Sequence, residues 1–542
     1  MNRKIDTKEE LDVIIIGGGA TGAGIARDCS LRGIRVLLLE RKDISTGATG
    51  RNHGLLHSGA RYAVTDRESA EECIKENMIL KRIASHCVED TSGLFITLPE
   101  DDLAYQATFV EACTKASIPA EILDPMEALR LEPSANAALI GAVRVPDGAV
   151  DPFRLTAANI LDAKWHGAKV LTYHEVVSIH REQDRVVGVQ VYDKLKRETK
   201  DFYAPIVVNA CGIWGHHISN LAGVNIEMLP SKGSLLIFGH RVNNMVVNRC
   251  RKPADADILV PGDTICIVGT TSVKLPYDEI DNTAYIPNEE IDLLLREAEK
   301  LSPILAHTRI LRAYAGVRPL VSLGGGDLGR NISRGIVLLD HAERDGLEGF
   351  ITITGGKLMT YRLMAEEATD LICRKLHVAA LCQTAIRHLP GSQEDKEAVK
   401  AKIVSLPIMQ RHSTLSRHGD MAAEFAGSND EDNGLICECE GVSVAELKYA
   451  IDRLDVNNLI DLRRRTRIGM GTCQGEFCIA RGAGVLSDCS QNKHIKEDIR
   501  SFLNERWSGI KPIAWGDALR EAEFSLWIYE GVCGIINEDY EI

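Results

Sequence analysis

The segment from Val13 to Glu40 constrains the fold more than any other part of the chain. The apolar run Val13–Ile16 is typical of a buried parallel strand, and a G-x-G-x-x-G pattern follows it at Gly17, Gly19 and Gly22. A helix is expected over residues 23–32, and a second apolar strand, Val36–Leu39, then leads to Glu40. This order of strand, glycine loop, helix, strand and acid predicts a dinucleotide-binding βαβ unit.

Each residue type in this unit has a physical role. Gly17 permits a tight turn, Gly19 lets the backbone approach a pyrophosphate, and Gly22 lets helix and strand pack closely. The phosphates would lie at the positive end of the helix dipole. Glu40 would accept hydrogen bonds from a ribose diol and repel a 2′-phosphate. The unit alone therefore predicts FAD or NAD.

Composition narrows the class of protein further. The 542 residues carry a formal net charge of −14, which argues against a nucleic-acid partner. At this length we expect roughly three or four domain-sized units. We expect no transmembrane segment and no signal peptide, because no apolar run is long enough and the first residues are charged. In such a chain most of the 15 cysteines should be reduced core thiols.

Several later segments combine strands with glycine-rich turns. They are residues 51–62, 207–214, 269–271, 315–319 and 350–360. Gly212 ends one apolar strand, and Gly355 and Gly356 end another before a helix expected over residues 359–375. That helix would offer a second N-terminus to a phosphate or a flavin carbonyl. Taken singly, each segment reads more readily as an ordinary turn.

The order and spacing of these segments resemble the FAD-dependent glycerol-3-phosphate dehydrogenases, and most closely their anaerobic branch. This family lies within the amino-acid-oxidase-like flavoproteins, and the resemblance covers nearly the whole chain. It implies an α/β fold over residues 1–376, in which a Rossmann-like FAD-binding domain holds an inserted antiparallel substrate domain. It also implies oxidation of sn-glycerol 3-phosphate to dihydroxyacetone phosphate in anaerobic respiration.

The same resemblance implies partners and a location. Electrons would pass to the quinone pool through two partner subunits, a second flavoprotein and a membrane-anchoring iron–sulfur protein, with room for FMN in that complex. The enzyme would then lie peripherally on the cytoplasmic face of the inner membrane.

A phosphorylated substrate needs cations in its pocket. Arg61, Arg318 and Lys357 stand in the motif segments, where we expect turns and not solvated helix faces. Arginine forks suit phosphate well. The resemblance places these three residues and Arg334 in the family's substrate pocket. A surface charge in a polar loop is an equally good reading of Arg334.

Alcohol oxidation also needs a general base. Related single-subunit enzymes carry a histidine just after a Lys/Arg–Gly step, but here Lys232 and Gly233 are followed by Ser234. The candidates are therefore His57, His53 and His240, and each could equally be a structural histidine.

Four cysteines stand apart from the rest. Cys437 and Cys439 form a C-x-C pair, and Cys473 and Cys478 form a C-x4-C pair after residues 440–472, a span long enough for two short helices. Three glycines, at 469, 471 and 475, let backbone amides approach sulfur near the second pair. The spacing favours a [2Fe–2S] cluster over a structural zinc or free thiols, and residues 435–490 resemble the bacterioferritin-associated-ferredoxin (BFD) type of [2Fe–2S] module.

The remaining segments are a linker region, residues 377–434, and a tail, residues 491–542. In the tail one helical face carries Trp515, Leu519, Ala522 and Leu526, with Trp527 beside it. This face either packs on its own domain or docks a partner subunit.

Two other function classes remain to be weighed. An oxygen-using oxidase of the same fold would not need the cysteine module. An acidic chain whose Arg and Lys candidates stand in motif segments argues against a tRNA-modifying or purely structural FAD protein.

Overall fold

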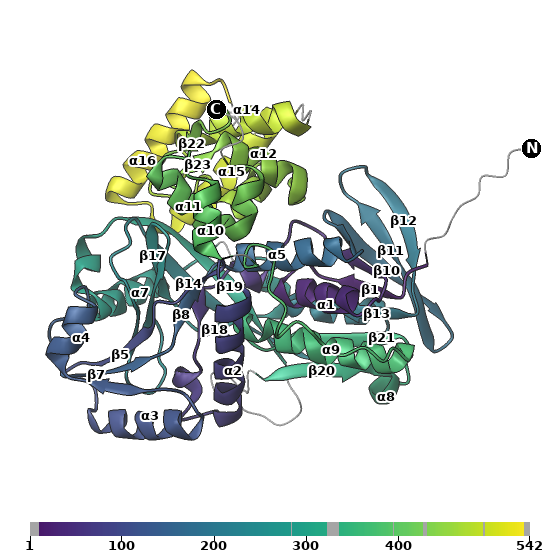
Figure 1. The fold of residues 1–542 in the computed structure, drawn as a ribbon, viewed down its shortest axis with the longest axis horizontal. Coiled ribbons are helices and arrows are strands. Elements are labelled where there is room, and N and C mark those ends of the chain that lie inside the picture. Colours follow the sequence, from purple (N-terminus) through teal and green to yellow (C-terminus); the bar gives the residue numbers. More distant parts are fainter. Residues whose placement is uncertain are drawn as a thin grey trace, which may run out of the picture.

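The predicted βαβ unit forms the centre of a six-stranded sheet (Figure 1). The computed structural model describes residues 10–282, 285–321, 335–393, 395–426, 431–490 and 494–535. The strands of this sheet are parallel except for the first, and their spatial order is β20 (Ile336–Asp340), β21 (Phe350–Gly355), β13 (Ile206–Asn209), β1 (Val13–Ile16), β2 (Val36–Leu39) and β9 (Lys169–Leu171).

Every residue of β1 is buried because both faces of the sheet are covered. Val13 and Ile15 pack in a core with helices α1 (Ala20–Leu31) and α9 (Tyr361–Leu376). Ile14 and Ile16 face the opposite core. That core is closed by an antiparallel sheet of β10 (His174–Glu182), β11 (Arg185–Asp193) and β12 (Glu198–Tyr203). Helix α5 (Pro152–Trp165) packs beside α1.

The expected inserted domain is a nine-stranded sheet (left side of Figure 1). Its strands are β18 (Val273–Lys274), β14 (Met228–Phe238), β17 (Ile265–Gly269), β16 (Ile258–Gly262), β15 (Val246–Arg249), β5 (Gly93–Thr97), β7 (Gly141–Val145) and β6 (Glu121–Leu123), with β19 (Ile310–Val321) paired to β14. Its pairs are antiparallel as predicted, except that β5 and β15 run parallel. These two strands come from separate segments of the chain, so no hairpin fixes their direction.

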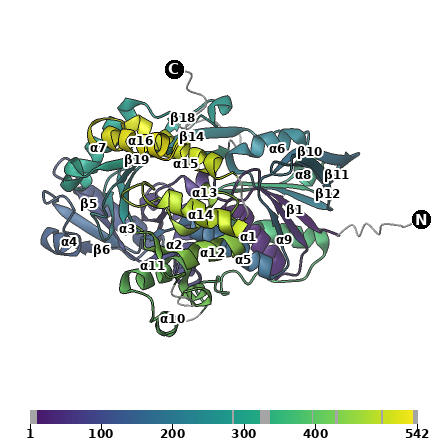
Figure 2. The same cartoon turned by 90° about the horizontal axis from the view of Figure 1, so that it is seen from above.

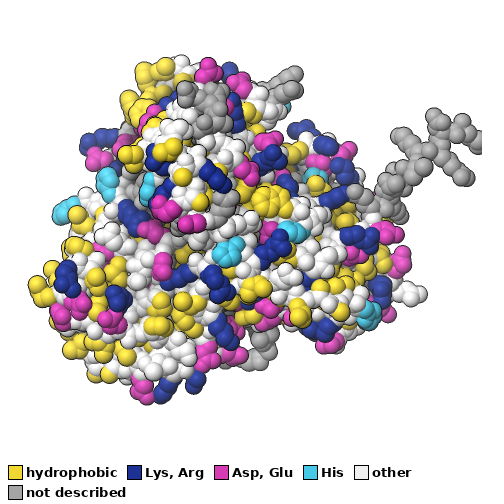
Figure 3. Space-filling model, in the orientation of Figure 1, with side chains coloured by type: hydrophobic (Ala, Val, Ile, Leu, Met, Phe, Trp, Pro, Cys, Tyr) yellow, Lys and Arg dark blue, Asp and Glu magenta, His cyan; other side chains and the backbone are white. Residues whose placement is uncertain are grey.

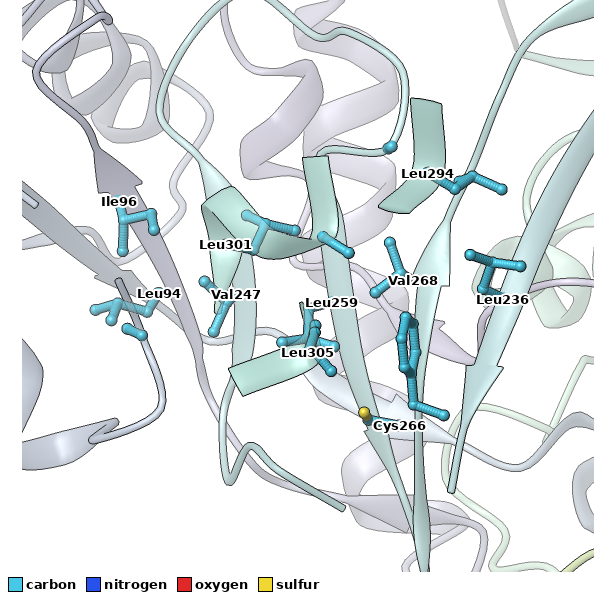
Figure 4. Close-up of a cluster of buried hydrophobic side chains, with 14 of the residues drawn as sticks. Leu94, Ile96, Leu236, Val247, Leu259, Cys266, Val268, Leu294, Leu301 and Leu305 are labelled. Carbon is cyan, nitrogen blue, oxygen red and sulfur yellow. The ribbon is translucent and has the colours of Figure 1, made fainter. Parts of the chain in front are cut away.

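Helices pack on this sheet and form its core. They are α3 (Ala104–Lys115), α4 (Pro125–Leu131) and α7 (Asn288–Leu301). Figure 4 shows part of the core, where Leu94 and Val247 from the sheet lie in one cluster with Leu294 and Leu301 of α7. This part of the chain also contains the helix α2 (Arg67–Ile83) and a small sheet of β3 (Leu55–Leu56), β8 (Gly148–Val150) and β4 (Val88–Glu89). Two short helices, α6 (Gly215–Leu221) and α8 (His341–Asp345), lie near β13 and β21.

The C-terminal part is a helical module that lies across both sheets (Figures 1 and 2). Helices α10 (Lys396–Lys402) and α11 (Ile408–His418) precede it, within the expected linker region. The module contains β22 (Leu435–Cys437), β23 (Val442–Ser443), α12 (Val444–Arg453), α13 (Leu459–Thr466), α14 (Cys478–Ser490), α15 (Ile495–Ile510) and α16 (Gly516–Trp527). Helices α12 and α13 are the two short helices predicted between the cysteine pairs.

Ion pairs join this module to the rest of the molecule. Asp43, just after β2, is buried and accepts hydrogen bonds from Arg464 at 2.9 Å and Arg465 at 2.5 Å. The Tyr173 hydroxyl donates to Asp461 at 2.7 Å. These contacts place helix α13 against the dinucleotide-binding sheet.

No helix in the described ranges is both long and apolar enough to cross a membrane.

Candidate active site and cysteine centre

The glycine loop lines one part of a cavity at the carboxyl ends of β1 and β2, together with Ala20 and Thr21 at the start of α1. Gly17 has a φ of +117°, and a Cβ there would lie 2.6 Å from the Ala210 carbonyl oxygen. A Cβ at Gly22 would lie 1.9 Å from the Gly17 oxygen, so helix and loop approach too closely for a side chain. Helix α1 begins at Ala20, three residues before the expected start. Its N-cap residue Gly19 offers no side chain, and the Ala20 N–H donates to Thr49 Oγ1 at 3.1 Å.

Glu40 lies in the same cavity and contacts the loop. Its two carboxylate oxygens accept hydrogen bonds from the Gly18 N–H at 2.7 Å and the Lys42 N–H at 2.9 Å. Burial raises the pKa of Glu40, and these two backbone donors oppose that rise. Each oxygen keeps a further lone pair for a ribose hydroxyl. With the glycine loop at the start of α1, this arrangement fits a dinucleotide such as FAD.

The strand ends predicted from the other glycines line this cavity as well. Gly212, Gly355 and Gly356 have φ values of +56°, +77° and +64°. A Cβ at Gly356 would meet the Met364 sulfur of α9 at 2.5 Å. The turn before α9 therefore requires glycine on both conformational and steric grounds.

Lys357 also lines this cavity. Its ammonium is buried and lies 4.7 Å from the centre of the Tyr62 ring. It has no hydrogen-bond partner among the residues that the structure describes. A buried ammonium in this state would gain strongly from an anionic ligand.

Arg318 also lines the cavity, but its predicted position in a turn is wrong. It lies inside the long strand β19, opposite Ser231 of β14. The glycine and proline around it signalled a turn, yet β19 pairs with β14 along nearly its whole length and accommodates both. The Arg318 guanidinium donates to Ser231 Oγ, the Lys232 oxygen, Thr270 Oγ1 and the Thr271 oxygen at 2.5–3.3 Å.

Gly233 makes room for that guanidinium, a role that the sequence did not reveal. A Cβ at Gly233 would lie 2.6 Å from Arg318 Nη2. The Lys232–Gly233 step, which lacks the histidine of the related enzymes, therefore forms part of the binding site of the Arg318 side chain. Its lysine, Lys232, is bound by Glu290 at 2.6 Å.

Arg61 reaches the cavity from a 3₁₀ turn, residues Ala60–Tyr62. Its Nη2 donates to the Ala254 oxygen at 3.0 Å and to Asp257 at 3.2 Å. Its buried Nη1 has no partner in the described part of the chain. Arg334 lies outside the described residues.

The candidate histidines separate into two groups. His57 and His53 line the cavity, with ring centres 5.9 Å apart, and His57 lies 5.5 Å from Tyr62. His240 is exposed at the end of β14 and is not part of the cavity lining, so its candidacy as the base is wrong. His217, which the sequence did not single out, does line the cavity.

The four selected cysteines lie together in the module. Cys437 and Cys473 each hydrogen-bond with Cys478, and Cys473 also contacts Cys439. Contacts from Cys478 and from the Gly475 and Phe477 amides lower the pKa of Cys473 to about 5. Helix α14 begins at Cys478, so its positive end faces the sulfurs.

This donor set fits a two-iron cluster. Four cysteines are the ligands of [2Fe–2S] centres, in which each iron takes two of them. Gly471 adds to the fit, because a Cβ there would lie 2.4 Å from the Cys439 Cβ.

Comparison with known families gives the class of protein. Residues 12–362 match the FAD dependent oxidoreductase family, and residues 435–488 match the BFD-like [2Fe-2S] binding domain. The chain belongs to the FAD dependent oxidoreductases and carries a BFD-like module after the FAD-binding part. The predicted fold and both predicted cofactor modules are thereby confirmed, and FAD replaces the initial choice between FAD and NAD.

Individual relatives are more specific. The chain is 62% identical over 537 residues to one subunit of the anaerobic glycerol-3-phosphate dehydrogenase of Escherichia coli, covering 99% of each chain. It is 61% identical over 526 residues to the corresponding subunit of Haemophilus influenzae (97% of this chain, 93% of the relative). A glycerol-3-phosphate dehydrogenase from Bacillus halodurans, solved with FAD, has a TM-score of 0.70 at 23% identity, with 94% and 97% of the chains covered. The family predicted from the motif segments is confirmed.

Proposed function

We propose that this chain is the catalytic subunit of an FAD-dependent glycerol-3-phosphate dehydrogenase. It would oxidise sn-glycerol 3-phosphate to dihydroxyacetone phosphate. The observation that carries the proposal is the pair of buried, unpartnered cationic atoms in the cavity, Lys357 Nζ and Arg61 Nη1, among the described residues. The relatives named above support the same substrate.

Different residues of the chain would bind the cofactor, bind the substrate phosphate and remove the hydroxyl proton. Glu40 and the glycine loop would hold the dinucleotide, while Arg61, Arg318 and Lys357 would bind the substrate phosphate. Bound FAD supplies the acceptor for the hydride that leaves C2. An imidazole nitrogen of His57 would take the hydroxyl proton, so that one C–H and one O–H bond break as the carbonyl forms.

The test is anaerobic reduction of the bound flavin. We expect sn-glycerol 3-phosphate to bleach the oxidised-flavin band of the full chain, and equal concentrations of glycerol to leave it nearly unchanged. Lys357→Met should raise KM about 10- to 100-fold, since a charge-assisted contact contributes about 1.5–3 kcal/mol. Lys375→Met is the matched control, because Lys375 pairs with Asp340 away from the cavity.

Two results would contradict the proposal. One is a flavin that the phosphorylated substrate does not reduce, and the other is equal reduction by glycerol. Rapid peroxide formation under air would point instead to an oxidase.

The partner and location proposals rest on an exposed apolar surface beside the cysteines. Trp527 is 64% exposed and Phe524 57% exposed on α16, and Phe477 is 61% exposed between the two cysteines of the second pair. Figure 3 shows hydrophobic side chains at the top of the molecule, over α16. The predicted single face is divided in the structure, because Ala522 is buried whereas Trp515 and Leu526 are exposed.

We propose that this surface docks an electron-accepting partner subunit. The relatives are named as one subunit of an enzyme, which implies others. Electrons would leave through the cysteine module and the partners, namely a second flavoprotein, which could hold FMN, and a membrane-anchoring iron–sulfur subunit. They would reach the quinone pool from a peripheral position on the cytoplasmic face of the inner membrane.

A further inference from the structure

Strand β14 has two faces, and the flavin cavity, the one lined by the glycine loop, lies on only one of them. Gly233 lines that cavity, and Ser231 on the same face contacts Arg318, its direct partner on β19. Successive side chains of a strand point to opposite faces. Lys232 and Ser234 therefore point away from the cavity, towards helix α7, which packs on the sheet.

Glu290 binds the strand from this second face. It lies on the buried side of α7, one turn before Leu294 of the core in Figure 4. One of its carboxylate oxygens pairs with the Lys232 ammonium at 2.6 Å. The other accepts hydrogen bonds from the Ser234 hydroxyl at 2.7 Å and the Thr271 hydroxyl at 2.6 Å. One carboxylate therefore joins β14 to the segment that follows β17.

The same two segments hold the arginine of the flavin cavity. On β14, the Arg318 guanidinium donates to the Ser231 hydroxyl and the Lys232 oxygen. After β17, it donates to the Thr270 hydroxyl and the Thr271 oxygen. Because a guanidinium is planar and its donors are fixed, it fits these four acceptors only when the two segments are correctly spaced.

Lys232 and Thr271 belong to both sets of contacts. Each accepts from Arg318 with its backbone oxygen and donates to Glu290 with its side chain. Burial raises the pKa of Glu290, but the hydrogen bonds from Lys232, Ser234 and Thr271 outweigh it, so the pKa is lowered. Glu290 is therefore ionised at neutral pH, and its hydrogen bonds are of the stronger, charge-assisted kind. Removing its charge would leave the buried Lys232 ammonium without its counter-ion.

We propose that Glu290 is a positioning residue, which keeps Arg318 in the geometry that binds the substrate phosphate. It lies outside the lining of the flavin cavity and acts through Lys232 and Thr271, from the opposite face of β14. This inference rests on the proposed function, because it takes Arg318 as a ligand of the phosphate. A displaced guanidinium weakens substrate binding, whereas the flavin and His57 keep their places.

The test is stopped-flow reduction of the bound flavin by sn-glycerol 3-phosphate, without oxygen, in the full chain. The dependence on substrate concentration gives a dissociation constant and a limiting rate. We expect Glu290→Gln to raise the dissociation constant about tenfold and to change the limiting rate by less than about threefold, because only uniform binding is lost. Thr271→Val removes one hydroxyl from Glu290 but keeps the oxygen that binds Arg318, so it should act in the same direction and more weakly.

A double variant distinguishes this role from a general loss of structure. If Glu290 acts through Arg318, then Glu290→Gln should add almost nothing in a chain that already carries Arg318→Gln. Glu132→Gln is the matched control, because Glu132 is a buried carboxylate of the same inserted domain. It binds the amides of Asn244 and Met245 at 2.7 Å, outside the flavin cavity, and its loss should leave the dissociation constant unchanged. The thermal midpoint of each variant checks that it is folded.

Three results would overturn the proposal while leaving the proposed function intact. They are an unchanged dissociation constant in Glu290→Gln, an equal rise in Glu132→Gln, and a full additional rise when Glu290→Gln is combined with Arg318→Gln. A flavin that sn-glycerol 3-phosphate does not reduce in the unmodified chain would instead contradict the proposed function, and this inference with it.

Discussion

Removing the Glu40 carboxylate should release FAD from the protein. In the structure both oxygens of Glu40 already hold backbone N–H groups, of Gly18 at 2.7 Å and of Lys42 at 2.9 Å. Each hydrogen bond from a ribose hydroxyl to this charged acceptor contributes about 1.5–3 kcal/mol. Even the loss of one such bond predicts a dissociation constant for FAD about 10- to 100-fold higher in Glu40→Ala.

The assay is the FAD content after gel filtration, followed by titration of the apoprotein with FAD. Glu40→Ala also frees the Gly18 and Lys42 amides, so the thermal midpoint of the apoprotein must be measured beside it. Glu175→Ala is the matched control, because Glu175 lines the same cavity but pairs with Lys194 at 2.9 Å. Unchanged FAD content in Glu40→Ala, or equal loss in Glu175→Ala, would refute the role of Glu40 as the ribose acceptor.

Three further outcomes are expected. Cys473→Ser should abolish the EPR signal of the reduced cluster and leave anaerobic flavin reduction intact, because no described residue beyond Met364 lines the flavin cavity. Glu446 pairs with Arg417 at 2.5 Å. Burial raises the pKa of Glu446, but the charge of Arg417 outweighs it, so the pKa falls from 4.5 to about 2. This contribution to stability, about 3 kcal/mol, should therefore be complete above about pH 4.5 and disappear as the pH falls towards 2; urea unfolding of Glu446→Gln should lack this dependence. Combined Phe524→Ser and Trp527→Ser should lower recovery of the chain in the membrane fraction without changing flavin reduction.

Each of these has its own control. Cys489→Ser changes an exposed cysteine of the same module and should retain the EPR signal, whereas zinc without iron in the unmodified chain would make the module structural. If Glu446→Gln loses stability in acid as steeply as the unmodified chain, the ion pair is not the cause. Full membrane recovery of the double variant would show that partners dock elsewhere.

The predicted site residues that the structure brings together belong to local patterns. The glycine loop, Glu40 and the cysteine pairs lie within short stretches of chain, and their chemistry follows from spacing alone. The turn before α9 belongs to this group, because glycine readily adopts the positive φ that Gly355 and Gly356 have there. The predicted turn around Arg318 was wrong for the same reason. Its glycine and proline neighbours are typical of a turn, and only the pairing with β14 makes this segment a strand.

The sequence by itself determined the class of fold and the two cofactor modules. It also predicted which residues would hold the cofactors, because those predictions depend on backbone geometry or donor spacing within short stretches of chain. Only the tertiary structure decided which distant side chains meet. It placed Gly233 against the Arg318 guanidinium, and it put His217 but not His240 in the lining of the flavin cavity. It also brought Arg312 and Arg463 to one shared carboxylate, that of Glu505. Contacts between residues far apart in the chain arise from how layers pack, and no local pattern encodes them.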